Sequence, residues 1–252
     1  MSRFSGNDDE MFVSESEQTA LEPVVKKEEP KPAVVEPTNG MDQDEMLNSL
    51  QKKVYVFDES GSMASSLPRE EGKSEDEREV KMDLVKRIMK RFVTDRFKRY
   101  PNSQISVLGF GNTTRVICKA GAKWKEVQDA IDELKADSGT DILQAVEFAV
   151  QHVEEEPSKL KTNQIIFVSD GLDEKARKVG KFASRLKKLN ITFDFIYVRS
   201  ERAYFGYDRS IDALRELCKE TGGEYIEVDK ATEFEDRFLE VSNRLALPPA
   251  RG

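Results

Sequence analysis

Short apolar runs and helically spaced apolar residues alternate along the chain from about residue 52 onward. Each run is short enough to form a buried β-strand, and several runs end directly in small or acidic residues. This pattern predicts strands at residues 54–57, 104–110, 115–119, 164–168, 191–198 and 225–228.

Between these strands, apolar residues recur at spacings of three and four, which is typical of amphipathic helices. Met82, Val85 and Met89, for example, share one face of a helix predicted over residues 80–98. The remaining helices are predicted near residues 124–134, 142–153, 176–186, 211–218 and 234–245. Such alternation predicts one α/β domain, with a doubly wound, mostly parallel sheet and helices on both faces.

The first part of the chain lacks this periodicity. Residues 1–50 contain 12 acidic and 4 basic residues, so the rest of the chain holds 48 − 12 = 36 acidic and 40 − 4 = 36 basic residues. The whole formal charge of −8 therefore lies in this segment. We predict a disordered acidic tail over residues 1–47 and a folded domain over residues 50–247. The tail is either a passive solubilising segment or an acidic tether or ligand.

Charge and composition narrow the classes of function. A domain without net charge argues against nucleic acid as the main partner, because phosphate binding needs a basic face. No secretory signal and no apolar run of about 20 residues is visible, so we expect no membrane span. Cys118 and Cys218 are 100 residues apart and are expected to be small buried residues. These features favour a soluble, reduced, cytoplasmic protein.

Three polar clusters lie where predicted strands end or helices begin. They contain Asp58, Ser60 and Ser62, then Thr140, then Asp170. In doubly wound folds, ligands bind outside the carboxyl ends of the strands. Each residue alone could be a turn former or a helix cap, and Thr140 or Asp141 is expected to cap the next helix. Together, two carboxylates and three hydroxyls suit a hard cation such as Mg²⁺ or Mn²⁺.

The same residues resemble those of a known family. The run Asp58-Glu59-Ser60-Gly61-Ser62 looks like the D-x-S-x-S motif of von Willebrand factor type A domains with a metal ion-dependent adhesion site. Thr140 and Asp170 match the family's metal-site threonine and its final aspartate, and residues 221–225 resemble a stretch before its last strand. The resemblance implies that the hydroxyls ligate the metal directly and that the aspartates often act through water.

Two segments expected beside the predicted metal site could cover it or contact a partner. Residues 64–80 form a charged insertion with six acidic and three basic residues, either a solvated loop or a flap over the metal. Residues 199–210 contain residue types that anchor interfaces, and they either bind a partner or fold onto their own domain. The candidate partner-binding residues are Arg202, Tyr204, Phe205 and Tyr207.

The leading hypothesis is a non-enzymatic module that binds an Asp or Glu of a partner protein through Mg²⁺ or Mn²⁺. The resemblance also implies an intracellular adaptor that works beside an AAA+ ATPase of the MoxR type. One rival is a structural protein whose metal only stabilises loops. Another is a phosphoryl-transfer enzyme with Asp58 as nucleophile, although Ser60 replaces the second Asp that such enzymes usually need. A serine hydrolase is disfavoured, because the single histidine, His152, is expected at a helix surface or boundary.

Overall fold

The computed structural model describes residues 51–68, 78–156, 163–199 and 208–244. These ranges form a six-stranded sheet with the order β3-β2-β1-β4-β5-β6. Neighbouring strands are parallel except for β2 and β3, which are antiparallel. The strands are β1 (Lys52–Asp58), β2 (Ile105–Phe110), β3 (Thr114–Cys118), β4 (Asn163–Ser169), β5 (Ile191–Val198) and β6 (Tyr225–Val228).

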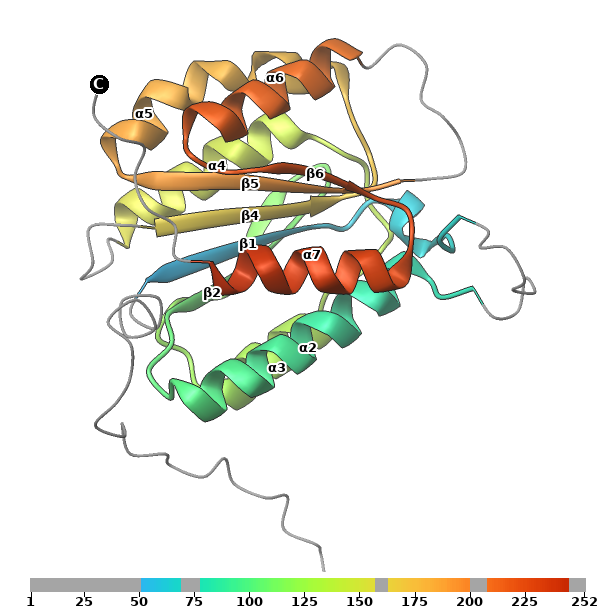
Figure 1. The fold of residues 1–252 in the computed structure, drawn as a ribbon, viewed down its shortest axis with the longest axis vertical. Helices are drawn as coiled ribbons and strands as arrows, with labels where there is room; N and C mark the ends of the chain where they lie inside the picture. Colours follow the sequence, from blue (N-terminus) through green and yellow to red (C-terminus); the bar gives the residue numbers. More distant parts are fainter. Residues whose placement is uncertain (1–50, 69–77, 157–162, 200–207, 245–252) are drawn as a thin grey trace, which may run out of the picture. The chain divides into compact units, whose positions relative to one another are not determined.

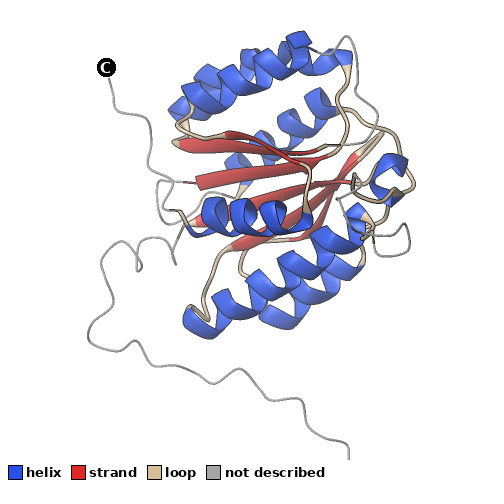
Figure 2. Ribbon diagram, turned by 45° about the vertical axis from the view of Figure 1, so that its right-hand side comes forward, coloured by secondary structure: helices blue, strands red, loops and turns tan. Residues whose placement is uncertain are grey.

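Helices cover both faces of this sheet (Figures 1 and 2). One face packs against α2 (Lys81–Arg99), α3 (Trp124–Asp132) and α7 (Ala231–Asn243). The other face packs against α4 (Ile142–Glu155), the 3-10 helix η3 (Glu174–Phe182), α5 (Ala183–Lys188) and α6 (Asp208–Glu220). The prediction of a doubly wound, mostly parallel α/β fold is confirmed.

Side chains of β1 show how the sheet divides the core. Tyr55 and Phe57 face the layer of α2 and α7, whereas Val54 and Val56 face the layer of α4. All four are fully buried. Because successive side chains of a strand point to opposite faces, a continuous apolar run is the expected sequence of a strand covered on both sides.

The predicted helix over residues 176–186 is present, but its first part is a 3-10 helix. The structure has the 3-10 helix η3 there, followed by the single α-helical stretch α5. Ala176, Val179 and Phe182 are buried at steps of three residues. This spacing matches the three residues per turn of a 3-10 helix, which places all three on one face.

The histidine expectation is wrong. His152 lies in α4 and is only 5% exposed. Its Nε2 lies 3.1 Å from Ser106 Oγ in β2. The buried hydroxyl of Ser106 gives the imidazole a polar partner inside the protein, which a sequence pattern of apolar residues does not reveal.

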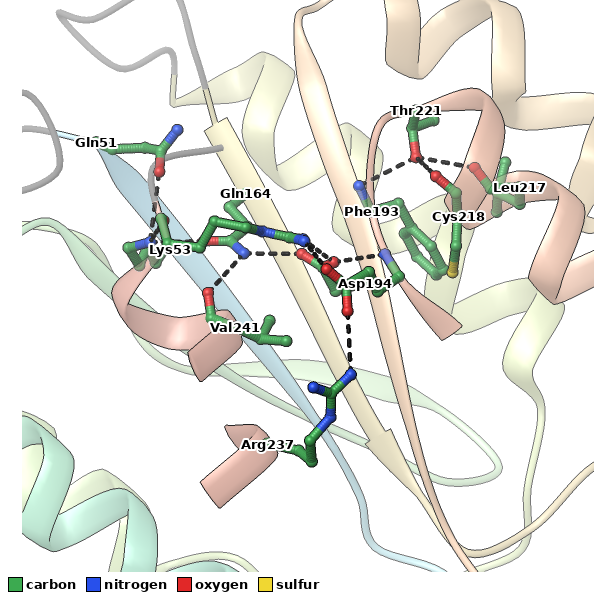
Figure 3. Close-up of polar contacts among 12 residues, drawn as sticks. Gln51, Lys53, Gln164, Phe193, Asp194, Leu217, Cys218, Thr221, Arg237 and Val241 are labelled. Atoms are coloured by element: carbon green, nitrogen blue, oxygen red, sulfur yellow. Dashed lines mark hydrogen bonds and ion pairs between the residues drawn. The ribbon is translucent and has the colours of Figure 1, made fainter. Parts of the chain in front are cut away.

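A buried polar cluster lies near the amino ends of the central strands, opposite the predicted metal site (Figure 3). Lys53 Nζ donates to Gln164 Oε1 at 2.6 Å, and Gln164 Nε2 donates to Asp194 Oδ2 at 2.7 Å. Asp194 also accepts hydrogen bonds from Arg244 and from the backbone of Glu224. The cluster joins β1, β4 and β5 to the end of α7, and each buried charge in it has an opposite charge or a hydrogen-bond partner.

Candidate metal centre

The fold brings the ends of β1 and β4 together. Asp58 is the last residue of β1, and Asp170 directly follows β4. The two strands are parallel neighbours, with Phe57 opposite Val168. The sheet order turns in opposite directions on either side of this pair, because β2 lies beyond β1 and β5 lies beyond β4. Ligands of doubly wound folds bind at such a switch point.

The first loop positions three of the predicted donors. Asp58 is fully buried, and the backbone amide of Ser60 donates to its Oδ1 at 2.7 Å. The hydroxyls of Ser60 and Ser62 lie 2.9 Å apart. Ser62 begins the turn of η1 (Gly61–Ala64) together with Gly61, and its Oγ donates to Asp170 Oδ1 at 2.6 Å. The predicted convergence of Asp58, Ser60, Ser62 and Asp170 is therefore present in the geometry.

Backbone hydrogen bonds fasten the second loop to the first. Ser60 and Ser138 form a parallel bridge, in which the amide of Gly61 donates to the carbonyl of Ser138 at 2.9 Å. Thr140 follows this bridge. A Cβ on Gly171 would lie 3.2 Å from Thr140 Oγ1 and 3.6 Å from Asp58 Oδ2. Both oxygens thus border the space above Gly171, and a glycine keeps that space free.

The capping expectation is met by the residue after Thr140. Asp141 is the N-cap of α4, and its Oδ1 accepts a hydrogen bond from the amide of Gln144 at 3.0 Å. Lys175 donates to the other carboxylate oxygen of Asp141. Asp141 therefore caps α4. Thr140 is the residue of this pair whose hydroxyl faces the site.

Glu59 points away from the donors, as expected, but it has a structural role of its own. Its Oε1 accepts hydrogen bonds from Arg115 at 2.8 Å and from the backbone amide of Lys135 at 2.9 Å. Its carboxylate packs where a Cβ on Gly109 would otherwise lie, since that atom would come within 2.2 Å of Glu59 Oε2. Glu59 thereby ties the first loop to β2, β3 and the segment before α4.

Sequence reasoning missed two side chains at the site. Ser169 donates to Asp58 Oδ2, and the amide of Gly171 donates to Ser169 Oγ at 3.1 Å. Lys81, the first residue of α2, is buried and donates to Asp170 Oδ2 at 2.6 Å. The position of Ser169, directly before Asp170 at a strand end, is a signal that could have been used. Lys81 carries no such signal, because a lysine at the start of an amphipathic helix is usually exposed.

Burial disfavours the ionised form of the Asp58 carboxyl. Desolvation raises the pKa of the Asp58 carboxyl to about 7, although hydrogen bonds from Ser169 and Ser60 oppose the rise. The nearby carboxylate of Asp170 adds to it. A cation beside Asp58 would offset this desolvation cost.

The donor chemistry fits a hard divalent cation. Within the described ranges, no group of three or more His, Cys, Asp or Glu side chains is arranged to hold a metal ion. The predicted set instead combines the two carboxylates with the hydroxyls of Ser60, Ser62 and Thr140. Oxygen donors of this kind suit Mg²⁺ or Mn²⁺, which commonly retain water as further ligands.

A charged cleft of about 420 Å³ adjoins the site on the side of β2 and β3. Its charged lining residues come from the first loop, β3 and the segment that leads to Thr140: Glu59, Arg115, Glu133, Lys135 and Asp137. A ligand bound above Thr140 would therefore have both positive and negative side chains beside it.

Several sequence predictions fall outside the described residues. They concern Arg202, Tyr204, Phe205 and Tyr207, residues 69–77 of the insertion, and the tail over residues 1–47. Cys118 and Cys218 are buried and free, as expected. None of the described helices is long and apolar enough to span a bilayer.

Comparison with known proteins supports the fold and shows a similarity to one family over part of the chain. Residues 54–172 match the family model of the von Willebrand factor type A domain. This segment contains all five predicted donors. A search of curated protein sequences found no significant match.

Solved structures with the same fold are distant in sequence. A von Willebrand factor type A protein from Catenulispora acidiphila is 18% identical with a TM-score of 0.59, over 77% of this chain and 42% of that chain. The PilB minor pilin from Streptococcus sanguinis is 14% identical with a TM-score of 0.60, over 77% and 61%. The vWF domain of the type V pili tip protein Mfa5 from Porphyromonas gingivalis is 10% identical with a TM-score of 0.57, over 77% and 94%. The match over residues 54–172 and the shared fold show that this part of the chain is similar to von Willebrand factor type A domains.

Proposed function

We propose that this domain binds protein partners through a divalent cation held at the carboxyl edge of the sheet. The observation that supports the proposal is the convergence of two aspartates and three hydroxyl residues from three separate segments of the chain. Ser62 Oγ, which donates to Asp170 at 2.6 Å, links the first of these segments to the last. Domains of this family often mediate protein–protein interactions, and two of the similar structures belong to pilus proteins.

The roles of the donors follow from their positions. Ser60, Ser62 and Thr140 would hold Mg²⁺ or Mn²⁺ through their hydroxyl oxygens, and Asp58 and Asp170 would contribute through water. When bound, the cation supplies an electrophilic position that a carboxylate oxygen of a partner can occupy. Ser62 and Thr140 are only half-buried, so this side of the site is open to a partner. The partner would present an Asp or Glu and would lie across the charged cleft.

We assign no catalytic activity to the site. The phosphoryl-transfer alternative needs a second carboxylate near Asp58, and Ser60 stands where it would be expected. The lysine that lies at the site, Lys81, is already paired with Asp170. Phosphatase activity that disappears in Asp58→Asn would contradict this assignment.

Calorimetric titration tests whether the site binds a divalent cation. We expect the wild type to bind Mg²⁺ or Mn²⁺ and Thr140→Ala to bind it at least about tenfold more weakly, because one ligand oxygen is lost. Thr232→Ala is the matched control, since Thr232 is exposed in α7 and does not line the charged cleft. Thr140→Ala is a cleaner test than Asp170→Ala, which would leave Lys81 buried without its carboxylate. Equal cation affinity in wild type, Thr140→Ala and Asp58→Ala would contradict the proposal.

Affinity capture with and without EDTA tests whether a partner binds through the cation. Wild type and Thr232→Ala should retain the same protein in Mg²⁺ and lose it in EDTA, whereas Thr140→Ala should not retain it. A MoxR-type AAA+ ATPase is the first defined bait, a choice that rests on the family resemblance. Cytoplasmic location belongs to the same proposal. Retention by Thr140→Ala, or retention that EDTA does not change, would show that no cation mediates the contact.

A further inference from the structure

A lysine already provides a positive charge at the candidate metal centre. Lys81 and Asp170 are both fully buried, and Lys81 Nζ lies 2.6 Å from Asp170 Oδ2. The contact is short and joins residues 89 positions apart. An ammonium group removed from water in this way needs a compensating negative charge, and Asp170 supplies it.

The backbone around Lys81 holds the ammonium in place. Lys81 is the first residue of α2, and its amide donates to the carbonyl of Ser65 at 3.1 Å. The neighbouring residue Val80 forms an antiparallel bridge with Ser66. The start of α2 is therefore attached to the segment that follows Ser62, one of the predicted donors.

Both carboxylate oxygens of Asp170 are occupied by the chain itself. Oδ1 accepts from Ser62 Oγ, and Oδ2 accepts from Lys81 Nζ. The two aspartates carry a formal charge of −2, which the ammonium of Lys81 reduces to −1. A divalent cation that enters this space meets like-charge repulsion from Lys81, and the site that it enters has lost half of its formal negative charge.

We propose that Lys81 is the resident counter-cation of the site, which neutralises Asp170 when no metal ion is bound and which sets the affinity for divalent cations. This inference rests on the proposed function. It has two consequences. The domain keeps its fold without metal, because Asp170 is already compensated. The oxygen donors bind Mg²⁺ more weakly than they would without the lysine.

The test replaces Lys81 with methionine, which has a similar length and no charge. Lys98→Met is the matched control, because Lys98 lies in the same helix with 59% of its side chain exposed. Magnesium affinity is measured by calorimetry at constant ionic strength, and thermal unfolding is measured in EDTA and in Mg²⁺. We expect Lys81→Met to bind Mg²⁺ at least about tenfold more tightly than wild type or Lys98→Met, and to unfold at a lower temperature in EDTA.

The possible results separate this inference from the proposed function. If wild type and folded Lys81→Met bind Mg²⁺ equally, the counter-cation role is wrong and the proposed function stands. If Lys81→Met binds Mg²⁺ and wild type does not, the proposed cation-dependent function is wrong and the counter-cation role is supported. If neither protein binds Mg²⁺, the counter-cation role is overturned.

A variant that unfolds in EDTA still gives an answer. Added Mg²⁺ should then restore the circular dichroism spectrum of Lys81→Met, because the cation replaces the missing positive charge. The double variant Lys81→Met/Asp170→Asn should regain metal-free stability, since it removes both charges of the pair. Failure of both Mg²⁺ and the second substitution to restore the fold would overturn the inference.

Discussion

Both carboxylate oxygens of Asp170 accept hydrogen bonds from side chains of the same chain, Ser62 on one oxygen and Lys81 on the other. The Asp58 carboxylate accepts hydrogen bonds from the backbone amide of Ser60 and from the hydroxyl of Ser169. These hydrogen bonds fix the orientation of both carboxylates, and a small cation with strict geometry requires oriented oxygen atoms around it. At the scale of single residues, the partners of the aspartates therefore matter as much as the aspartates.

His152 gives the folded domain a specific pH dependence. Burial lowers the pKa of its imidazole to about 4, with the nearby Lys52 acting in the same direction. In the unfolded chain the pKa of histidine is about 6.5. The unfolded chain therefore binds the proton first as the pH falls. The stability that comes from neutral, buried His152 is complete above about pH 6.5 and is lost as the pH falls towards 4.

We predict that the wild type loses stability more steeply than His152→Gln between about pH 6.5 and pH 4, by up to about 1.4 kcal/mol per pH unit. Denaturant unfolding of both proteins across this range measures the difference. The carboxylates that titrate in the same range are common to both proteins, so they cancel. Parallel pH profiles would show that His152 does not contribute.

At the scale of elements, the stretch over residues 221–225 fastens α6 to the sheet. Thr221 Oγ1 accepts from the amide of Phe193 in β5 and donates to the carbonyl of Leu217 in α6 (Figure 3). Gly222 has a φ of 77°, which glycine adopts readily at a helix end. The amide of Gly223 donates to the carbonyl of Cys218 at 2.8 Å, which closes the last turn of α6. This stretch, noticed in the sequence for its family resemblance, has a structural role.

Gly223 should not tolerate a side chain. A Cβ there would lie 1.9 Å from the carbonyl oxygen of Phe193, and a backbone atom of a central strand cannot move away easily. We predict that Gly223→Ala destabilises the domain by about 2 kcal/mol or more. Gly180→Ala is the control, because no atom lies within 4 Å of its Cβ position, and it should stay within about 1 kcal/mol of wild type. Equal unfolding midpoints for the two variants would contradict this account.

At the scale of the whole domain, the two ends of the charged insertion meet. The backbone amide of Leu67 donates to the carbonyl of Glu79 at 3.1 Å. The backbone amide of Lys81 donates to the carbonyl of Ser65. Leu67 is buried, so the first end of the insertion also contributes to the core. The two described ends that flank residues 69–77 are thus paired with each other beside the candidate metal centre.

We predict that replacing residues 69–77 with a Gly-Ser-Gly linker leaves the thermal unfolding midpoint within a few degrees of wild type, because the paired ends and Leu67 remain. If the insertion competes with the partner for the site, the shortened protein should also bind the partner more tightly. Differential scanning calorimetry and partner titration measure the two effects. A large drop in the unfolding midpoint would mean that residues 69–77 themselves stabilise the fold, and unchanged affinity would exclude the flap.

Apolar periodicity alone determined the layered sheet, since a strand covered on both faces must be apolar throughout and a covering helix must carry an apolar stripe. It also determined where Asp58, Thr140 and Asp170 would meet, because parallel strands end at one edge. The resemblance to a known family added the roles of these donors, which the structure leaves as a proposal.

Tertiary structure alone decided which polar side chains pair across the fold. Lys81 with Asp170, Lys53 with Gln164 and His152 with Ser106 join residues that are far apart in the chain. The pattern of apolar and polar residues along the sequence does not predict such pairs, because polar residues at these positions are usually exposed. The sequence therefore located the oxygen donors of the candidate metal centre, and only the packing of α2 against one face of the sheet placed a lysine among them.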